Sequence, residues 1–462
     1  MSAPAHTPSS AGPLAVVSRL AGLAASVQAY VGPALALILG AIALGRSPVD
    51  VDEGATIAAA RGSFSDVVEG AFENDPARVG YLALLRPVVA WNDDELWVRL
   101  PSVLAIAVAA YAVYRLGRRL FDARVGAVAS ILLASSLGTV AIARSVGPLA
   151  LALAAMLVST ALFARAIERG HVVWWALYVV TTAALPLTHP IAASALAAQL
   201  VATGFARRET DLRLAVPAVG IATLECALYL VAGVVDRADA ADGAGPLALD
   251  EIGVGVGRAV GWSPIVAVLA VWGFVHLSRR VAHDLPRWKL ALVAGLTGAP
   301  LVAVLAAGAA LPVYPREALT VAIGGVALAA GAGLVAIADR SLRLATLGAV
   351  AAVVIASLVT AALAERQQDW REAATLTRSL ATERDSVVVV PDRARFALAY
   401  YAPELELLRA GRGAAVTVVV VGDPADAVTA ARTVVSPPRY ALLEQREAGS
   451  RLIVQHWVRP GS

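Results

Sequence analysis

Three acidic residues lie close together in the segment Ser47-Pro-Val-Asp-Val-Asp-Glu-Gly-Ala-Thr56, directly after the first long apolar run of the chain. They are Asp50, Asp52 and Glu53, and a further acid, Asp75, follows later in the same polar stretch. Carboxylates at a membrane–water boundary can bind a divalent cation or accept a proton from an attacking hydroxyl group. On spacing alone, solvated loop acids are the more common explanation of such a pattern.

The composition indicates the class of protein in which these acids lie. Hydrophobic residues make up 58% of the 462 residues and charged residues only 16%, and the mean hydropathy is +0.71. Soluble globular proteins have about 45–50% apolar and about 25% charged residues. The apolar runs of Ala, Val, Leu, Ile and Gly approach the roughly 20 residues that a helix needs to cross a bilayer. The chain is therefore predicted to be a polytopic integral membrane protein.

Charge and cysteine usage narrow the choice of partners. The net charge of +3 comes mostly from arginines at the ends of apolar runs, so we expect membrane lipid and no nucleic acid as partners. The single cysteine, Cys226, lies inside an apolar run and is expected to be a small core residue.

The predicted fold class is an all-α polytopic membrane protein with about eleven transmembrane helices and a small extracytoplasmic α/β domain at the C-terminus. Residues 1–28 are expected to be disordered or interfacial, 29–364 to form the transmembrane domain with a first extracytoplasmic loop at 46–98, and 365–462 to form the α/β domain, with few links to the membrane helices beyond the last one. The candidate spans lie near 29–45, 100–117, 125–143, 148–165, 172–188, 190–206, 214–233, 262–278, 288–311, 317–338 and 345–363.

Arginine and lysine concentrate in alternate short loops, and this bias predicts the orientation. With the N-terminus in the cytoplasm of a multi-pass plasma (inner) membrane protein, the acidic loop and the C-terminal domain lie outside. The basic residues of the cytoplasmic loops are Arg115, Arg118, Arg119, Arg124, Arg165, Arg169, Arg207, Arg208, Arg213, Arg279, Arg280, Arg287, Lys289, Arg340 and Arg343.

Several short motifs occur in the order typical of a known superfamily. The acid pair is followed by Trp97-Val-Arg-Leu-Pro-Ser102, by the arginine-rich run at 115–124, and by Val313-Tyr-Pro-Arg-Glu317, Asp369-Trp-Arg-Glu-Ala-Ala374 and Ala399-Tyr-Tyr-Ala-Pro403. Together, over most of residues 40–405, they resemble the C-type (GT-C) membrane glycosyltransferases. The resemblance is to the bacterial mannosyltransferase and aminoarabinose transferase branch, related to protein O-mannosyltransferases.

The resemblance implies a hexosyltransferase, mannosyltransferase-like, that takes a sugar from a polyprenyl-phosphate donor and passes it, with inversion, to a glycan, lipid or protein acceptor on the extracytoplasmic face. By position, Asp52 corresponds to the general base, Glu53 to its neighbour and Asp75 to the second acid. Asp52 and Asp75 are also the candidate ligands of a divalent cation, Mg²⁺ or Mn²⁺. The candidate substrate-binding residues are Arg61, Arg144, His189 and Arg316.

Alternatives remain for several of these residues and for the function. His189 is also explained as a cap at a helix break, and Arg316 as an interfacial arginine at a helix start. The sequence departs from the family pattern after Asp75 and at Arg144-Ser-Val-Gly147, which leaves open a non-catalytic relative that binds a lipid-linked glycan. A transporter or flippase is a third possibility, but the chain shows no internal repeat and few charges deep inside its spans.

Overall fold

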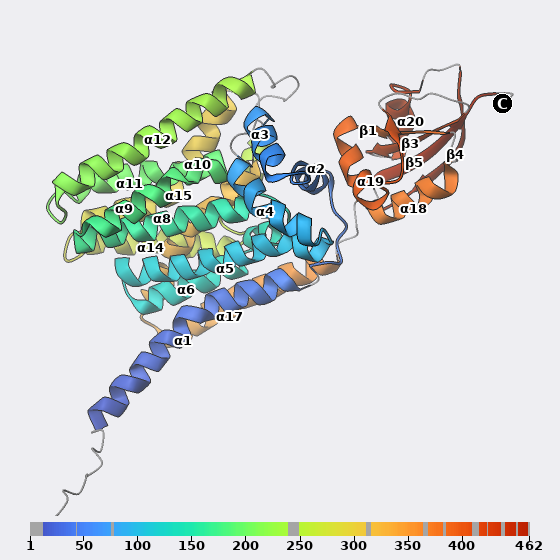
Figure 1. Ribbon diagram of the computed structural model, residues 1–462. Coiled ribbons are helices and arrows are strands. Elements are labelled where there is room, and N and C mark those ends of the chain that lie inside the picture. The colour runs from blue at the N-terminus through green and yellow to red at the C-terminus, as the bar shows by residue number, and fades with distance from the viewer. Residues whose placement is uncertain are drawn as a thin grey trace, which may run out of the picture.

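The computed structural model describes most of the chain, and helices account for most of what it describes (Figure 1). The described residues are 13–42, 44–74, 78–238, 249–310, 316–363, 368–381, 385–408, 415–422, 424–435, 439–449 and 451–460.

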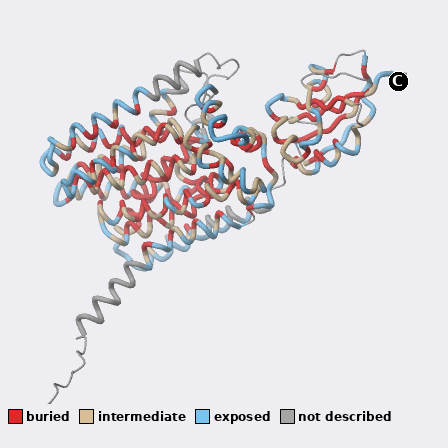
Figure 2. The backbone as a smooth tube through the Cα atoms, viewed as in Figure 1, coloured by how far each residue is buried: buried red, intermediate tan, exposed pale blue. Residues whose placement is uncertain are grey.

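The long helices pack side by side in one bundle, and buried residues are concentrated along them (Figure 2). The bundle consists of α1 (Pro13–Ala41), α5 (Glu95–Leu120), α6 (Ala123–Ser135), α7 (Leu137–Ala143), α8 (Leu149–Arg169), α9 (Val172–Ala183), α10 (Leu185–Thr188), η2 (Pro190–Ala193), α11 (Ser194–Phe205), α12 (Leu212–Ala238), α14 (Pro264–Val281), α15 (Arg287–Ala310), α16 (Ile323–Val335) and α17 (Arg340–Leu363).

The number of membrane spans differs from the sequence-based expectation. Among the described residues, five helices are long and apolar enough to cross a membrane, or six if α6 and α7, bent by 62° at their junction, count as one span. Other apolar helices, such as Val172–Thr188 and Pro190–Phe205, are shorter. The break at 188–190 lies where the sequence predicts it, because Pro190 cannot continue a helix from Thr188. A multi-pass membrane protein is confirmed, and the count of eleven is not.

Small residues let α16 lie at the centre of the bundle. Every residue from Ile323 to Leu334 is buried. A methyl group built on Gly273 of α14 would lie 1.8 Å from the Ala329 carbonyl oxygen, and one built on Gly333 would lie 2.1 Å from the Leu269 carbonyl oxygen. Glycine therefore permits a backbone-to-backbone approach of α14 and α16, as in other close-packed membrane helices.

The first polar loop folds into three helices at one end of the bundle (Figure 1). They are α2 (Val51–Ala59), α3 (Phe64–Asn74) and α4 (Val79–Trp91). Two further short elements, α13 (Leu249–Ala259) and η3 (Arg316–Ala322), pack against each other. Buried Val49, Ile57, Tyr81 and Leu85 form an apolar cluster in the loop, which Val146 joins from the segment between α7 and α8.

The C-terminal segment forms a five-stranded sheet in the order β2-β1-β3-β5-β4, with three helices and a short η4. Strands β1, β2 and β3 are parallel, and β5 pairs antiparallel with β3 and β4. The bounds are α18 (Trp370–Leu380), β1 (Ser386–Val390), η4 (Asp392–Ala394), α19 (Arg395–Tyr401), β2 (Leu407–Leu408), β3 (Ala415–Val421), α20 (Pro424–Ala431), β4 (Ala441–Glu447) and β5 (Leu452–Val458).

Apolar runs at 386–391, 415–421 and 451–458 predict three strands, which correspond to β1, β3 and β5, but the two edge strands are not predicted. Strands β1 and β3 consist mostly of valine and β5 begins Leu-Ile-Val, and most residues of all three strands are buried. Strand β4 is largely exposed, and β2 has only two residues, so neither carries an apolar signal.

The C-terminal domain contacts the first loop closely, a link that the sequence did not predict. The Tyr401 hydroxyl accepts a hydrogen bond from the Val49 amide at 2.7 Å, and the Tyr400 hydroxyl donates to the Asp93 carbonyl at 2.5 Å. A methyl group on Gly54 of α2 would lie 2.7 Å from the backbone nitrogen of Ala397 in α19. Such contacts across distant parts of the chain have no periodic signal in the sequence.

Candidate active site

The acidic segment is held in place by the start of α2. Asp50 is the N-cap residue: its carboxylate accepts a hydrogen bond from the Glu53 amide at 2.8 Å, and the Glu53 carboxylate accepts one from the Asp50 amide at 3.2 Å. This reciprocal capping box satisfies two amides that the helix leaves open. The first turn of α2 therefore sets the positions of all three carboxylates.

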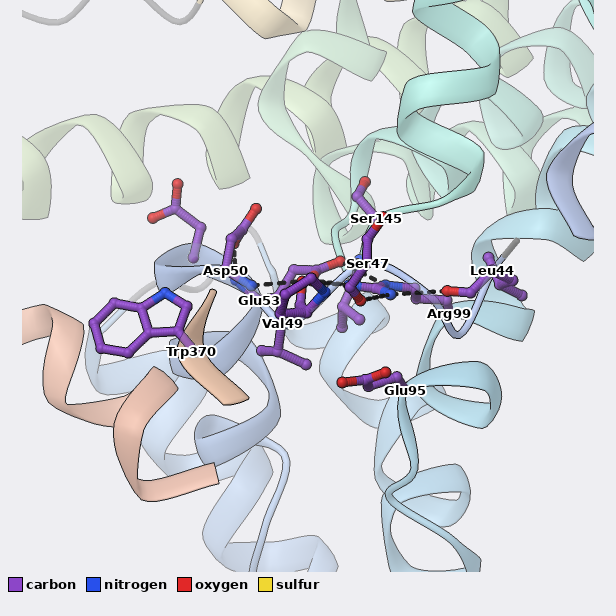
Figure 3. Close-up of polar contacts among 12 residues, drawn as sticks. Leu44, Ser47, Val49, Asp50, Glu53, Glu95, Arg99, Ser145 and Trp370 are labelled. Atoms are coloured by element: carbon purple, nitrogen blue, oxygen red, sulfur yellow. Dashed lines mark hydrogen bonds and ion pairs between the residues drawn. The ribbon is translucent and has the colours of Figure 1, made fainter. Parts of the chain in front are cut away.

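Glu53 is buried and forms an ion pair with Arg99 of α5 (Figure 3). Only 5% of the Glu53 side chain and 2% of the Arg99 side chain are exposed. The guanidinium donates twice, Nε to Oε1 at 3.0 Å and Nη2 to Oε2 at 2.5 Å. Two parallel charge-assisted hydrogen bonds make this a geometrically specific pair.

Arg99 also ties α5 to the segment that follows α1. Its remaining hydrogen bonds go to the carbonyl oxygens of Leu44 at 2.8 Å, Ser47 at 2.8 Å and Pro48 at 3.1 Å. Sequence reasoning missed this role, although Arg99 lies inside the motif Trp97–Ser102. The available signal was the rule that a buried carboxylate needs a charged partner.

Glu53 also holds the segment that carries Arg144. The Val146 amide donates to Glu53 Oε1 at 2.8 Å, which fixes the turn between α7 and α8 beside the ion pair. Arg144 is half-buried, and within the described part of the chain its side chain makes no hydrogen bond or ion pair. Burial lowers the pKa of Arg144, and the positive charge of nearby Arg99 lowers it further. An arginine in this position is suited to accept an anionic ligand.

Asp52 points outward from the same turn. Its side chain is 79% exposed and forms an ion pair with Arg393 of η4, which is 66% exposed. The pair links α2 to the C-terminal domain, but exposed pairs contribute only about 0–1 kcal/mol. Asp52 is therefore accessible to a substrate, whereas Glu53 is not.

Asp50 carries the third carboxylate and has a raised pKa. Asp50 is exposed at its surface, but neighbouring protein atoms partly desolvate its carboxyl group and disfavour the charged form; repulsion from Glu53 and Asp52 adds to this and raises the pKa of Asp50 to about 6. Like charges two and three residues away raise a carboxyl pKa in this manner.

Arg61 and His189, two of the other predicted site residues, have partners of their own outside this turn. Arg61 pairs with Asp93 at 2.9 Å and lies over the Tyr400 ring at 5.9 Å. His189 caps η2, its Nδ1 accepting from the Ile191 amide at 3.2 Å, as the capping interpretation predicts. Arg316 is the first residue of η3, and Asp75 lies outside the described residues.

Comparison with known proteins bears on the fold. A family model described as dolichyl-phosphate-mannose-protein mannosyltransferase matches residues 79–235, and no protein of curated function has a matching sequence. The crystal structure of ArnT from Cupriavidus metallidurans bound to undecaprenyl phosphate superposes with a TM-score of 0.59 at 14% identity, covering 92% of this chain and 97% of that one. Its apo form gives 0.59 at 13% identity, covering 94% and 98%.

A more distant structure shares the same arrangement. The apo oligosaccharyltransferase from Archaeoglobus fulgidus superposes with a TM-score of 0.51 at 11% identity, covering 81% of this chain and 64% of that one. The chain has a C-type membrane glycosyltransferase fold. The expected resemblance is therefore confirmed, and at these identities the structural likeness establishes the fold alone.

In this glycosyltransferase fold, a polar cavity of about 470 Å³ lies between the first loop and the C-terminal domain. Glu95 lines this cavity, and its carboxylate accepts hydrogen bonds from Arg371 and Tyr401. Sequence reasoning missed the cavity, although the acidic run at 93–95 marks one wall. Its lining residues are Gly45, Asp93, Asp94, Glu95, Leu96, Arg371, Tyr400 and Tyr401.

The predicted metal site is not tested by the part of the fold that the structure describes. Carboxylate oxygens suit Mg²⁺ or Mn²⁺. Across the described ranges, however, no group of three His, Cys, Asp or Glu side chains comes together, and Asp52 already pairs with Arg393. The second candidate ligand, Asp75, is not among those residues.

Proposed function

We propose that this chain is a membrane enzyme that transfers a sugar from a polyprenyl-phosphate donor to a hydroxyl group of a glycan, lipid or protein acceptor. The observation that carries the proposal is the exposed Asp52 on the first turn of α2, next to Glu53, whose carboxylate also holds the turn that follows half-buried Arg144 through the Val146 amide. A fold shared over nearly the whole chain with a protein crystallised with undecaprenyl phosphate supports the choice of donor.

The proposed reaction is a single displacement. The Asp52 carboxylate accepts the proton of the acceptor hydroxyl, and the acceptor oxygen forms a bond to the anomeric carbon from the face opposite the phosphate. The bond between that carbon and the phosphate oxygen breaks, and its electron pair leaves with polyprenyl phosphate. The configuration at the sugar inverts. Negative charge develops on the departing phosphate, where a fixed cation such as Arg144 lowers the barrier.

Glu53 has a different role in this proposal. Both of its oxygens accept hydrogen bonds in the interior, from Arg99, Val146 and Asp50. It is therefore a positioning residue, which holds the turn with Asp52 and the segment with Arg144 in fixed relation.

The remaining candidate residues support the proposal unequally. Arg61 and His189 already have partners, so they are weaker candidates for phosphate binding than Arg144. Arg316 stays a proposed substrate contact. Arg393 must release Asp52 when the acceptor arrives, and the small energy of an exposed pair permits this exchange.

The membrane orientation and the metal belong to the proposal as well. The arginine bias supports an extracytoplasmic position, outside the inner membrane, for α2 and the C-terminal domain. A divalent cation held by Asp52 and Asp75 would help to neutralise the donor phosphates.

The test is an assay of the full chain in lipid nanodiscs with radiolabelled polyprenyl-phosphate sugars. Asp52→Asn should cut turnover by roughly 10²–10⁴-fold, because asparagine keeps the shape but cannot accept the proton. The matched control is Asp50→Asn, which changes a neighbouring carboxylate in the same way and should have much less effect.

Other outcomes would revise the proposal. Full activity of Asp52→Asn together with loss in Asp75→Asn would move the base to the second acid. If the wild type shows no turnover but still binds a lipid-linked sugar, a binding protein in a glycosyltransferase fold is favoured. The departure from the family pattern at Arg144–Gly147 is the reason to consider this alternative. Loss of activity in EDTA and recovery with Mg²⁺ or Mn²⁺ would support the cation.

A further inference from the structure

Arginines converge at the end of the bundle opposite α2. A cavity of about 310 Å³ lies between the C-terminal ends of α5 and α8, lined by Arg115, Arg118, Arg119, Arg165, Glu168 and Arg169. Along α5, Arg119 is 24 residues from Glu95, or about 36 Å at 1.5 Å per residue. The cavity is thus separated from the candidate active site by about the thickness of a bilayer.

The positive charge in this cavity exceeds what the protein supplies to balance it. Five of its six lining residues are arginines and one is a glutamate. The C-terminal ends of the two helices carry a partial negative charge of about one half each. Glu168 and these two ends together offset about two of the five positive charges. Lys289, whose Nζ donates to the Arg119 carbonyl at 3.0 Å, adds a further positive charge nearby.

Several of these guanidinium groups have donors left for a ligand. Arg119 pairs with Glu168 at 2.8 Å, and Arg115 donates to the Tyr111 hydroxyl at 3.0 Å. Arg165 lies 3.9 Å from the centre of the Trp174 ring, and its buried Nε has no hydrogen-bond partner. Within the described part of the chain, the exposed side chains of Arg118 and Arg169 make no hydrogen bond or ion pair.

Apolar surface next to the cavity indicates what kind of anion fits. Helix α9 starts just after Arg169, packs against α8, and exposes Val172, Val173 and Leu177 by 58%, 50% and 43%. Acyl chains can lie along this face while a phosphate contacts the arginines. A soluble anion would use the arginines but not the apolar face.

We propose that this arginine cavity binds the phosphate headgroup of an anionic membrane lipid, on the membrane face opposite the candidate active site. Guanidinium groups bind phosphate by paired charge-assisted hydrogen bonds, and basic cavities between membrane helices suit such headgroups. The inference does not depend on the sugar-transfer reaction.

The experiment titrates the purified full chain in a neutral detergent with phosphatidylglycerol or with zwitterionic phosphatidylcholine, and counts bound lipids by native mass spectrometry. Phosphatidylglycerol should bind at least about tenfold more tightly. The double variant Arg118→Gln/Arg169→Gln should lose about tenfold or more of that affinity. Its thermal stability without lipid should not fall, because neither side chain has a partner to lose within the described residues.

The matched control is Arg207→Gln/Arg208→Gln, which removes two exposed arginines that lie one helical hairpin further along the chain, at the same end of the bundle but outside the cavity. It should retain the wild-type affinity within about twofold, since surface charge far from the ligand is largely screened. Equal binding of the two lipids, or equal loss in both double variants, would overturn the proposal. Competition by millimolar inorganic phosphate as strong as by phosphatidylglycerol would overturn the assignment to a lipid.

Discussion

Replacement of Glu53 by glutamine removes one charge of a buried ion pair and keeps the shape of the side chain. Arg99, which is 2% exposed, would then retain its positive charge without a carboxylate. Loss of one partner of a buried pair costs about 3–5 kcal/mol, because the other charge stays desolvated. We expect Glu53→Gln to lower the free energy of unfolding by that amount.

The neighbouring residue provides the control. Asp52→Asn is the equivalent change one position earlier, but its carboxylate is 79% exposed and pairs with an exposed arginine. It should cost about 0–1 kcal/mol. The two variants therefore differ in burial rather than in chemistry, and they should separate stability from turnover: Glu53→Gln loses stability, while Asp52→Asn loses activity with little change in stability.

Cys226 provides the assay. It is the single cysteine of the chain and is 1% exposed, so a thiol-reactive fluorophore reports its exposure as the bundle unfolds. The double variant Glu53→Gln/Arg99→Met should recover part of the loss, because it removes both buried charges. Equal apparent melting temperatures for Glu53→Gln and Asp52→Asn would refute the assignment of Glu53 to the interior. A double variant less stable than Glu53→Gln would show that the hydrogen bonds of Arg99 to the loop matter more than its charge.

Two further predictions concern α2. The pKa of Asp50 is raised from 3.8 to about 6 in the folded state, so its protonated form stabilises the fold below pH 4, and this stabilisation is lost as the pH rises through 6. The melting temperature of Asp50→Asn relative to that of wild type should therefore increase between pH 4 and pH 7. A difference that stays constant over this range would contradict the raised pKa. Gly54→Ala should loosen the contact of the C-terminal domain and lower the free energy of unfolding by about 1–3 kcal/mol, because the new methyl group clashes with the Ala397 backbone. Gly70→Ala is the control and should have no such effect, because no heavy atom lies within 4 Å of its new methyl group. Equal protease resistance of the two variants would argue against the contact.

The contact of the C-terminal domain with α2 gives that domain a place in the proposed reaction. Arg393 pairs with Asp52, and Tyr401 binds the loop that carries it. A domain attached only through the last helix would leave Asp52 open to water on all sides. Here the C-terminal domain instead contacts Asp52 directly through Arg393.

The sequence by itself determined the class of the protein. Long apolar runs make a polytopic helical protein the only stable outcome in lipid, since backbone groups must pair within each segment. Runs such as Val387–Val390 and Val416–Val421 likewise marked the buried strands, because a buried strand reads as a continuous apolar stretch. The acid pair after the first span was visible for the same reason: charge stands out against apolar flanks.

Only the tertiary structure decided which of the two adjacent acids is buried and which is exposed. Asp52 and Glu53 are adjacent and chemically alike, and the sequence assigned both to catalysis. They differ because their partners lie in distant parts of the chain: Glu53 pairs with Arg99 in the interior, and Asp52 pairs with Arg393 at the surface. Burial and ion pairing are set by the packing of whole helices and domains, and a local pattern of residue types does not encode them.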